Sequence, residues 1–145
     1  MQITLAHVGS RDGNEAQVEM YLGRCSGWAK CAARGFRGED ALLEWVVKQG
    51  GRTPVAAVLL DSRGRTMSSE AFAGWLGARR DDGVQHVVFA MGPASGWSEA
   101  ARTRAQLLLS FGPMTLAHGL ARLVMAEQIY RAVTILSGHP YHSGH

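Results

Sequence analysis

Residues 92–145 read GPASGWSEAARTRAQLLLSFGPMTLAHGLARLVMAEQIYRAVTILSGHPYHSGH, and the rest of the chain is best understood from this segment. It begins with a bend bounded by Gly92 and Gly96 and continues through a short helical pattern to an apolar run at 107–111. A second glycine-containing loop then leads into a long helical pattern over 117–136. This order of bend, strand, loop and helix indicates an α/β unit.

Two unbroken apolar runs, 55–61 and 86–91, precede this segment. Such runs are typical of strands that are buried on both faces of a parallel sheet. The alternating residues 2–9 predict a further strand, and residues 29–36 are a weaker strand candidate.

Helical patterns separate the predicted strands. They cover residues 14–27, 39–49 and 68–80, with Ser68 or Ser69 as the cap of the third. A fourth, short helix is predicted over 99–105. Strands that alternate with helices favour an α/β fold with a mostly parallel sheet.

Length and composition fit one domain over residues 1–145, because domains usually contain about 100 to 200 residues. The formal net charge of +3 permits a polyanionic partner without requiring one. The first residues lack the pattern of a signal peptide, and no stretch reaches the roughly 20 apolar residues of a membrane span. We therefore expect a soluble, cytoplasmic protein, in which Cys25 and Cys31 are free thiols.

The loops that follow the predicted strands are the first place to expect chemistry. In open α/β sheets, ligands bind beyond the carboxyl ends of the strands. Here the loops at 60–65, 92–96 and 111–116 contain glycines, which allow the main chain to approach a ligand closely. Each glycine turn taken alone is more often only a turn. The chain lacks a P-loop and a complete Gly-x-Gly-x-x-Gly motif, which argues against ordinary nucleotide binding.

The ordered features of residues 92–145 resemble the C-terminal half of the SPOUT-class methyltransferases. The resemblance is closest to the RlmH family, the 23S ribosomal RNA pseudouridine N3-methyltransferases. It rests on the Gly-x-x-x-Gly bend, the strand, the second loop, the helical motif AEQIYRA at 126–132 and the terminal HPYH at 139–142. The resemblance implies a SPOUT-like fold with a mostly parallel sheet flanked by helices, a C-terminal trefoil knot and a homodimer. It also implies methylation of N3 of a pseudouridine on the assembled ribosome, with S-adenosylmethionine as cofactor and no metal.

The same resemblance implies which residues bind the cofactor. These are Leu60, Gly92, Phe111, Gly112, Pro113, Met114, Thr115 and Leu116. The chain departs from the family at Pro93, where the family has a second glycine, and proline cannot supply an amide N–H. The variant also resembles the Gly-Pro-x-x-Gly-Trp bend of the 16S ribosomal RNA uridine N3-methyltransferases, so a uridine target is an alternative.

The substrate side of the reaction needs groups that help to remove the N3 proton or stabilise the resulting anion. Arg131, Tyr141 and His142 are the candidates, and Tyr141 could also stack on the base. The sequence does not choose among them. Glu127 lies four residues before Arg131, as in an ordinary surface ion pair. Ser143 stands where the family usually has a basic residue.

Histidines recur every third residue at the end of the chain: His139, His142 and His145. The spacing suggests a metal site, but Pro140 interrupts any helix and a chain terminus is a poor preorganised cage. Structural or incidental histidines are therefore favoured over metal ligands. His118 opens the long helix, at a position where the family also has histidine.

The final helix is apolar around most of its circumference, which predicts that it packs both on the core and on a second subunit. With a net charge of only +3 and no basic tract in one subunit, we expect RNA contacts to combine arginines of both subunits. The helical arginines are Arg79, Arg80, Arg102, Arg104, Arg122 and Arg131. Two alternatives remain: a non-catalytic RNA- or ribosome-binding module on the same scaffold, and a methyltransferase acting on a small molecule.

Overall fold

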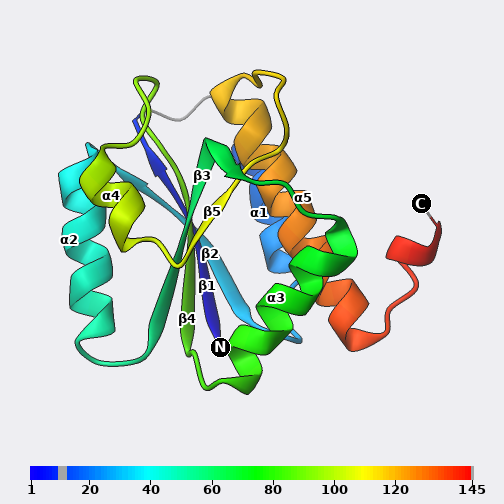
Figure 1. Cartoon of the computed structure of the whole chain (residues 1–145). Helices are drawn as coiled ribbons and strands as arrows, with labels where there is room; N and C mark the ends of the chain where they lie inside the picture. Colours follow the sequence, from blue (N-terminus) through cyan, green and yellow to red (C-terminus); the bar gives the residue numbers. More distant parts are fainter. Residues whose placement is uncertain (10–12, 145) are drawn as a thin grey trace.

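The computed structural model describes residues 1–9 and 13–144 of the chain. Its strands form one parallel five-stranded sheet in the order β2-β1-β4-β3-β5, which confirms the predicted α/β class (Figure 1). The strands are β1 (Gln2–Val8), β2 (Lys30–Phe36), β3 (Val55–Arg65), β4 (His86–Met91) and β5 (Leu107–Leu109).

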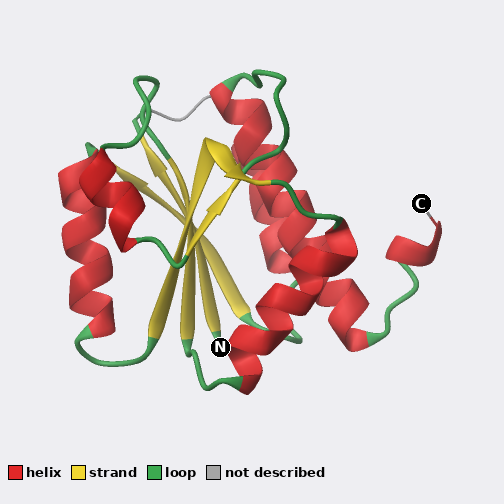
Figure 2. Cartoon of the chain, viewed as in Figure 1, coloured by secondary structure: helices red, strands yellow, loops and turns green. Residues whose placement is uncertain are grey.

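Helices cover both faces of the sheet (Figure 2). One layer contains α1, α3 and α5, with α5 in contact with both of the others, and the opposite layer contains α2 and α4 (Figure 1). The helices are α1 (Glu15–Gly23), α2 (Glu39–Gly50), α3 (Ser69–Asp81), α4 (Glu99–Arg104) and α5 (His118–Ser137), followed by a short 3-10 helix, η1 (His142–Gly144).

The central strand β4 explains why its sequence is an unbroken apolar run. All six of its residues are buried. Phe89 packs against Phe72 of α3, with ring centroids 5.6 Å apart, whereas Val88 belongs to the cluster formed with Leu42 of α2. Because successive side chains point to opposite faces, a strand covered on both sides requires apolar residues at every position.

The caps explain where several helices begin and end. Ser68 caps α3, because its hydroxyl accepts a hydrogen bond from the Ala71 amide at 3.0 Å. Ser98 caps α4 in the same way. Asn14 precedes α1 but makes no side-chain cap bond. At the other end of α5, Gly138 adopts a left-handed conformation with φ of 75°, a common helix stop.

The β3–β5 pair differs from the sequence prediction in two ways. β3 continues past Asp61 to Arg65, where a turn was predicted, and the pairing shifts so that both Leu60 and Arg65 face Leu109. Gly64 allows this irregularity, because a Cβ there would lie 2.6 Å from the main chain of Leu108. β5 ends at Leu109, two residues earlier than predicted.

Three absences can be stated for residues 1–9 and 13–144. No helix there is both long and apolar enough to cross a membrane. No group of three or more His, Cys, Asp and Glu side chains there is placed to hold a metal ion. Both cysteines lie in this part of the chain, and no disulfide joins them.

Candidate cofactor and substrate sites

A cavity of about 330 Å³ lies beyond the carboxyl ends of β4 and β5 and beside the irregular part of β3, where its pairing with β4 has ended. All eight positions that the resemblance assigns to the cofactor line it. They are Leu60, Gly92, Phe111, Gly112, Pro113, Met114, Thr115 and Leu116. The cavity is also lined by other residues, including Asp61, Ser62, Ser110, His118 and Ala121. The sequence did not assign these residues to the cofactor.

Residues 110–116, which follow β5, form one wall of this cavity. The Ser110 hydroxyl accepts a hydrogen bond from the Gly112 amide at 3.0 Å, and Gly112 has φ of 107°, which side chains rarely allow. The apolar side chains of Phe111 and Met114 are 36% and 82% exposed. A ligand in the cavity would therefore meet backbone groups and uncovered apolar surface together.

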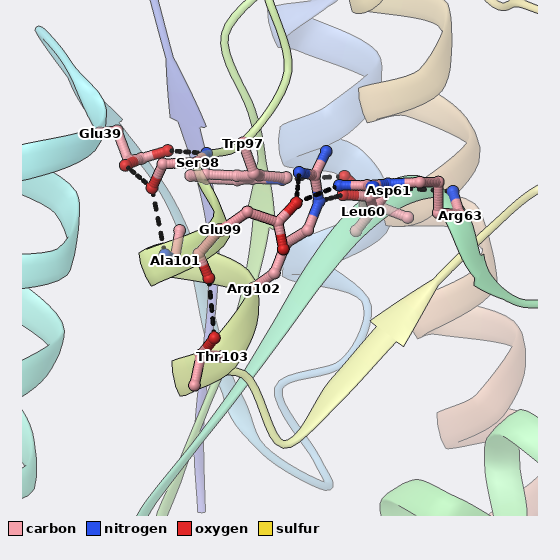
Figure 3. A network of polar contacts seen from close by, with 10 residues as sticks. All are labelled: Glu39, Leu60, Asp61, Arg63, Trp97, Ser98, Glu99, Ala101, Arg102 and Thr103. Atoms are coloured by element: carbon pink, nitrogen blue, oxygen red, sulfur yellow. Dashed lines mark hydrogen bonds and ion pairs between the residues drawn. The ribbon is translucent and has the colours of Figure 1, made fainter.

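Trp97 supports the opposite wall, and the sequence prediction gave its side chain no role there. Its buried indole N–H donates to the Leu60 carbonyl at 2.9 Å (Figure 3). A Cβ on residue 92 would lie 2.7 Å from Trp97 Cε2, so the indole occupies the space that a side chain at Gly92 would need. The absence of a side chain at Gly92 thus makes room for the Trp97 indole, and the Gly-x-x-x-Gly-Trp sequence could have indicated this contact.

Asp61 and Arg102 form a largely buried ion pair beside this wall. Arg102 Nε donates to Asp61 Oδ2 at 2.6 Å, and the Arg63 amide donates to Asp61 Oδ1 at 2.8 Å (Figure 3). Burial alone would raise the Asp61 pKa, but the hydrogen bonds from Arg102 and Arg63 and their charges hold the pKa below its usual value. Asp61 is therefore ionised at neutral pH.

Glu99 and Glu39 extend these contacts to α4 and α2. Glu99 Oε1 accepts from Arg102 Nη1 at 2.9 Å and from Arg63 Nη2 at 2.7 Å. Glu39 accepts from the Ser98 amide at 2.8 Å and from its hydroxyl at 2.5 Å (Figure 3). The contacts connect Asp61 and Arg63 of β3 with α4, and the start of α4 with α2.

The three substrate-side candidates also come together, at the other end of α5. Arg131 Nη1 lies 3.0 Å from His142 Nδ1, and the Arg131 guanidinium lies 5.0 Å from the centre of the Tyr141 ring. Glu127 binds Arg131 with both carboxylate oxygens, at 2.9 and 3.0 Å. The side chains of Arg131 and Glu127 are 11% and 21% exposed, so the pair is more buried than an ordinary surface i,i+4 pair.

We call Glu70, Glu127, Arg131, Tyr141 and His142 the tail cluster. His142 connects the other members to Glu70 of α3. Its Nε2 lies 2.6 Å from Glu70 Oε1. A guanidinium can only donate, so Nδ1 of His142 must accept from Arg131, and the ring proton resides on Nε2 and is donated to Glu70. This hydrogen bond is the main cause that lowers the Glu70 pKa. The contacts thus set the imidazole tautomer.

The tail cluster and the cofactor cavity do not meet within one subunit. His118, which lines the cavity, begins α5, and Arg131 lies about 20 Å farther along the helix, since an α-helix rises about 1.5 Å per residue. Figure 1 shows the tail leaving the far end of α5. The structure therefore brings the members of each candidate set together, but not the two sets.

A second cavity, of about 290 Å³, adjoins the first and shares Leu109, Ser110 and Phe111 with it. It runs between α5 and the segment before α3, and Val124 and Gln128 line it from α5. Apolar surface thus continues from the cofactor cavity along α5 towards the tail.

Several of the arginines predicted to form a basic surface instead make contacts within the subunit. Arg122 is only 2% exposed, and its Nη1 lies 3.2 Å from His7 Nδ1 of β1. Arg102 and Arg131 are held in the largely buried contacts described above. Arg80 and Arg104 are exposed. Arg122 therefore cannot contribute to an RNA-facing surface as predicted.

The terminal histidines take different contacts. His139 Nδ1 lies 3.2 Å from the Tyr141 amide, and His142 is bound by Arg131 and Glu70. His145 lies outside the residues that the structure describes.

Comparison with known proteins places the chain in a family. Residues 1–142 match the family described as "Predicted SPOUT methyltransferase". The chain is 46% identical over 125 residues to a protein of Koribacter versatilis named ribosomal RNA large subunit methyltransferase H, covering 86% of the chain and 85% of the relative. A Brucella abortus protein of the same name is 50% identical over 97 residues, covering 66% of the chain and 57% of the relative.

A solved structure shows the same fold. The methyltransferase AviRb from Streptomyces viridochromogenes, in complex with the cofactor AdoMet, superposes with a TM-score of 0.50 at 15% identity, covering 95% of this chain and 61% of that one. Because the family match extends over nearly the whole sequence, the chain belongs to the SPOUT methyltransferase family.

Proposed function

We propose that the protein is an S-adenosylmethionine-dependent methyltransferase that modifies large-subunit ribosomal RNA. The relatives named as ribosomal RNA large subunit methyltransferases support this proposal, as does the cofactor complex of AviRb. The observation that carries it is the single cavity that gathers all eight expected cofactor positions beyond the carboxyl ends of β4 and β5 and beside the irregular part of β3.

The cavity suits such a cofactor in size and chemistry. Its volume of about 330 Å³ falls within the roughly 300–1,000 Å³ common for small-molecule sites. Main-chain groups at Leu60, Gly92 and 111–116 would hold an adenosine moiety, and the exposed apolar surface of Phe111 and Met114 would cover it. When bound, the cofactor supplies an electrophilic methyl group. The protein then has mainly to align donor and acceptor.

For the acceptor, we propose N3 of a pseudouridine in 23S ribosomal RNA. Arg131 is best suited to stabilise the anion that forms as N3 loses its proton, because the guanidinium stays charged and is held by Glu127. His142 is better suited to orienting Arg131, since its Nδ1 already accepts from the guanidinium. Tyr141 offers a half-buried ring that could stack on the base.

We further propose that the complete site requires a homodimer. Along α5, Arg131 lies about 20 Å from His118 and about 15 Å from Ala121, both of which line the cavity, and this is too far for one subunit to align both reactants. Leu120 of α5 is 47% exposed, and the exposed residues Phe111 and Met114 shortly precede it in the sequence. Leu120 would supply an apolar interface. A twofold interface would place the tail cluster of one subunit at the cavity of the other. The trefoil knot remains an expectation from the family resemblance.

The intact ribosome is the expected substrate. Few helical arginines are exposed, and each phosphate contact adds only about −0.9 to the logarithmic salt slope of binding. Shape recognition of the assembled particle would supply the missing affinity. Ribosomes that lack the modification should therefore be methylated much faster than naked 23S RNA, and equal rates would refute this preference.

Calorimetric titration with S-adenosylmethionine, followed by that methylation assay, tests the proposed function. Failure to bind at millimolar cofactor would rule out the enzyme. Binding without methylation of either RNA substrate would favour the non-catalytic ribosome-binding module, which Pro93 and the absence of a basic residue at Ser143 support. Mapping the methylated nucleotide would separate pseudouridine from uridine as the target.

A further inference from the structure

Two residues outside the cofactor cavity hold one of its walls in place. Trp97 and Arg102 bind the irregular part of β3 through the Leu60 carbonyl and the Asp61 carboxylate, at 2.9 and 2.6 Å (Figure 3). Both residues line a separate, smaller cavity of about 170 Å³, which shares Leu60, Asp61, Ser62 and Gly92 with the cofactor cavity. They therefore touch the residues of the wall and not the space that a ligand would fill.

The wall needs such support, because the two segments that form it are not paired with each other. Pairing between β3 and β4 ends at Leu60 and Met91, and β3 is next paired only at Arg65, with Leu109 of β5. Pro93 provides no amide donor. The bend after β4 closes on itself instead, with the Gly96 amide donating to the Pro93 carbonyl at 2.9 Å.

Burial distinguishes these two contacts from the surface contacts around them. The Asp61 and Arg102 side chains are 3% and 19% exposed, and Trp97 is 5% exposed. The Arg63–Glu99 pair is 58% and 78% exposed, and such pairs contribute little. A charged pair removed from water and a buried indole N–H are costly to leave without partners, so they restrict the loop strongly.

We infer that Trp97 and Arg102 are positioning residues for S-adenosylmethionine, which hold the main chain at Leu60, Asp61 and Gly92 in the conformation that receives it. The Trp97 indole contacts both segments of the wall, since it binds the Leu60 carbonyl and fills the space next to Gly92. Arg102 fixes Asp61 directly to α4, and Glu99 of the same helix accepts from both Arg102 and Arg63. The inference rests on the proposed function for its ligand.

Substitutions that remove one contact at a time test it by calorimetry with S-adenosylmethionine. Trp97→Phe keeps an aromatic ring next to Gly92 but loses the N–H, and should raise the Kd about 3- to 10-fold, the usual worth of one hydrogen bond. Arg102→Ala leaves Asp61 buried without its cation and should raise the Kd more than about 10-fold. Arg102→Lys should recover part of that loss. At saturating cofactor, kcat on ribosomes should stay near the wild-type value in all three.

The control is Lys48→Ala, which breaks the exposed Glu44–Lys48 pair on α2 and should leave the Kd unchanged. Circular dichroism and melting curves establish that each variant is folded at the titration temperature. If Trp97→Phe and Arg102→Ala lower the melting temperature while the Kd stays within about twofold of wild type, their role is only structural and the inference fails. If the wild-type protein itself binds no cofactor, the proposed function fails as well.

Discussion

The two ends of α5 present different kinds of candidate site. At the His118 end, a cavity is lined by apolar and small polar residues and shaped by Gly92 and Gly112. At the Arg131 end, charged and aromatic side chains bind one another and dock the tail on α3 through Glu70. One end is shaped to enclose a small molecule, whereas the other gathers charged and aromatic groups.

The difference indicates a division of tasks. A sulfonium cofactor needs alignment more than acid–base chemistry, and a cavity of backbone groups provides alignment. A nitrogen that must lose a proton needs charge stabilisation, which is the role proposed for the Arg131 guanidinium. One helix places His118 and Arg131 about 20 Å apart, and this separation is the basis for the proposed site shared between two subunits.

Mixing two inactive variants should give the largest effect and tests this division directly. Arg131→Ala should lower kcat about 100- to 1,000-fold without changing the cofactor Kd, as loss of an anion-stabilising group does. Gly92→Ala should abolish cofactor binding, because the new Cβ would collide with Trp97. Dimers reassembled from an equal mixture should recover about a quarter of wild-type activity, since half are mixed and each mixed dimer has one complete site of two.

That recovery requires sites shared between subunits. If each subunit used its own Arg131 with its own cavity, mixed dimers would contain no complete site and activity would stay at background. Circular dichroism checks that Gly92→Ala folds, and Arg131→Lys tests whether a point charge can replace the planar guanidinium.

Disrupting the interface should separate cofactor binding from activity. Leu120→Glu places a charge on an α5 side chain that is 47% exposed in the isolated subunit, so folding should survive while the dimer dissociates. We expect monomers by light scattering, a cofactor Kd within a few-fold of wild type, and loss of most activity. Val47→Glu on α2, where Val47 is 60% exposed on the other side of the sheet, is the matched control and should remain dimeric. A wild-type protein that is already monomeric at micromolar concentration would contradict the dimer.

Removing the contact between the tail and α3 should have a smaller effect on activity, with cofactor binding unchanged. Glu70→Ala removes the acceptor of the His142 Nε2 proton, so the tail loses this contact with α3 and the imidazole is held by Arg131 alone. We expect kcat to fall about 3- to 10-fold, with the cofactor Kd unchanged, and Glu70→Gln, which keeps an acceptor oxygen, to lose less. Glu44→Ala is the control at an exposed helical glutamate. A change in cofactor Kd in Glu70→Ala would show that the two ends are not independent.

The sequence was sufficient for features that leave a local pattern. Val55–Asp61 and His86–Met91 were predicted as strands because burial on both faces requires unbroken apolar runs. The resemblance assigned eight cofactor positions that the fold gathers in one cavity. An isolated glycine in a strand suggests an irregularity, so Gly64 could have indicated the β3 bulge.

Contacts between distant parts of the chain left no such pattern. Asp61 and Arg102 are 41 positions apart, and an arginine in a short helix gives no indication of its partner. Arg122 was assigned to the surface by its charge alone. It lies three and seven residues before Met125 and Ile129, on the helical face that is buried, so helical periodicity argued for its burial.

The smallest expected effect is a shift in the pH dependence of cofactor binding. The pKa of Asp61 is lowered in the folded protein, so its contribution is present above the ordinary aspartate pKa of about 3.9 and is lost as the pH falls through the lower folded value. The wild-type Kd should therefore stay nearly constant from pH 8 to 5. In Arg102→Ala, burial remains while the chief hydrogen bond that lowers the pKa is gone, so the onset of acid weakening should move to higher pH. Titration of both proteins with the same cofactor cancels the ionisation of the ligand itself. An identical onset would mean that Arg102 does not control the charge of Asp61, whereas Glu70→Ala should leave the onset unchanged because it acts only at the other end of α5.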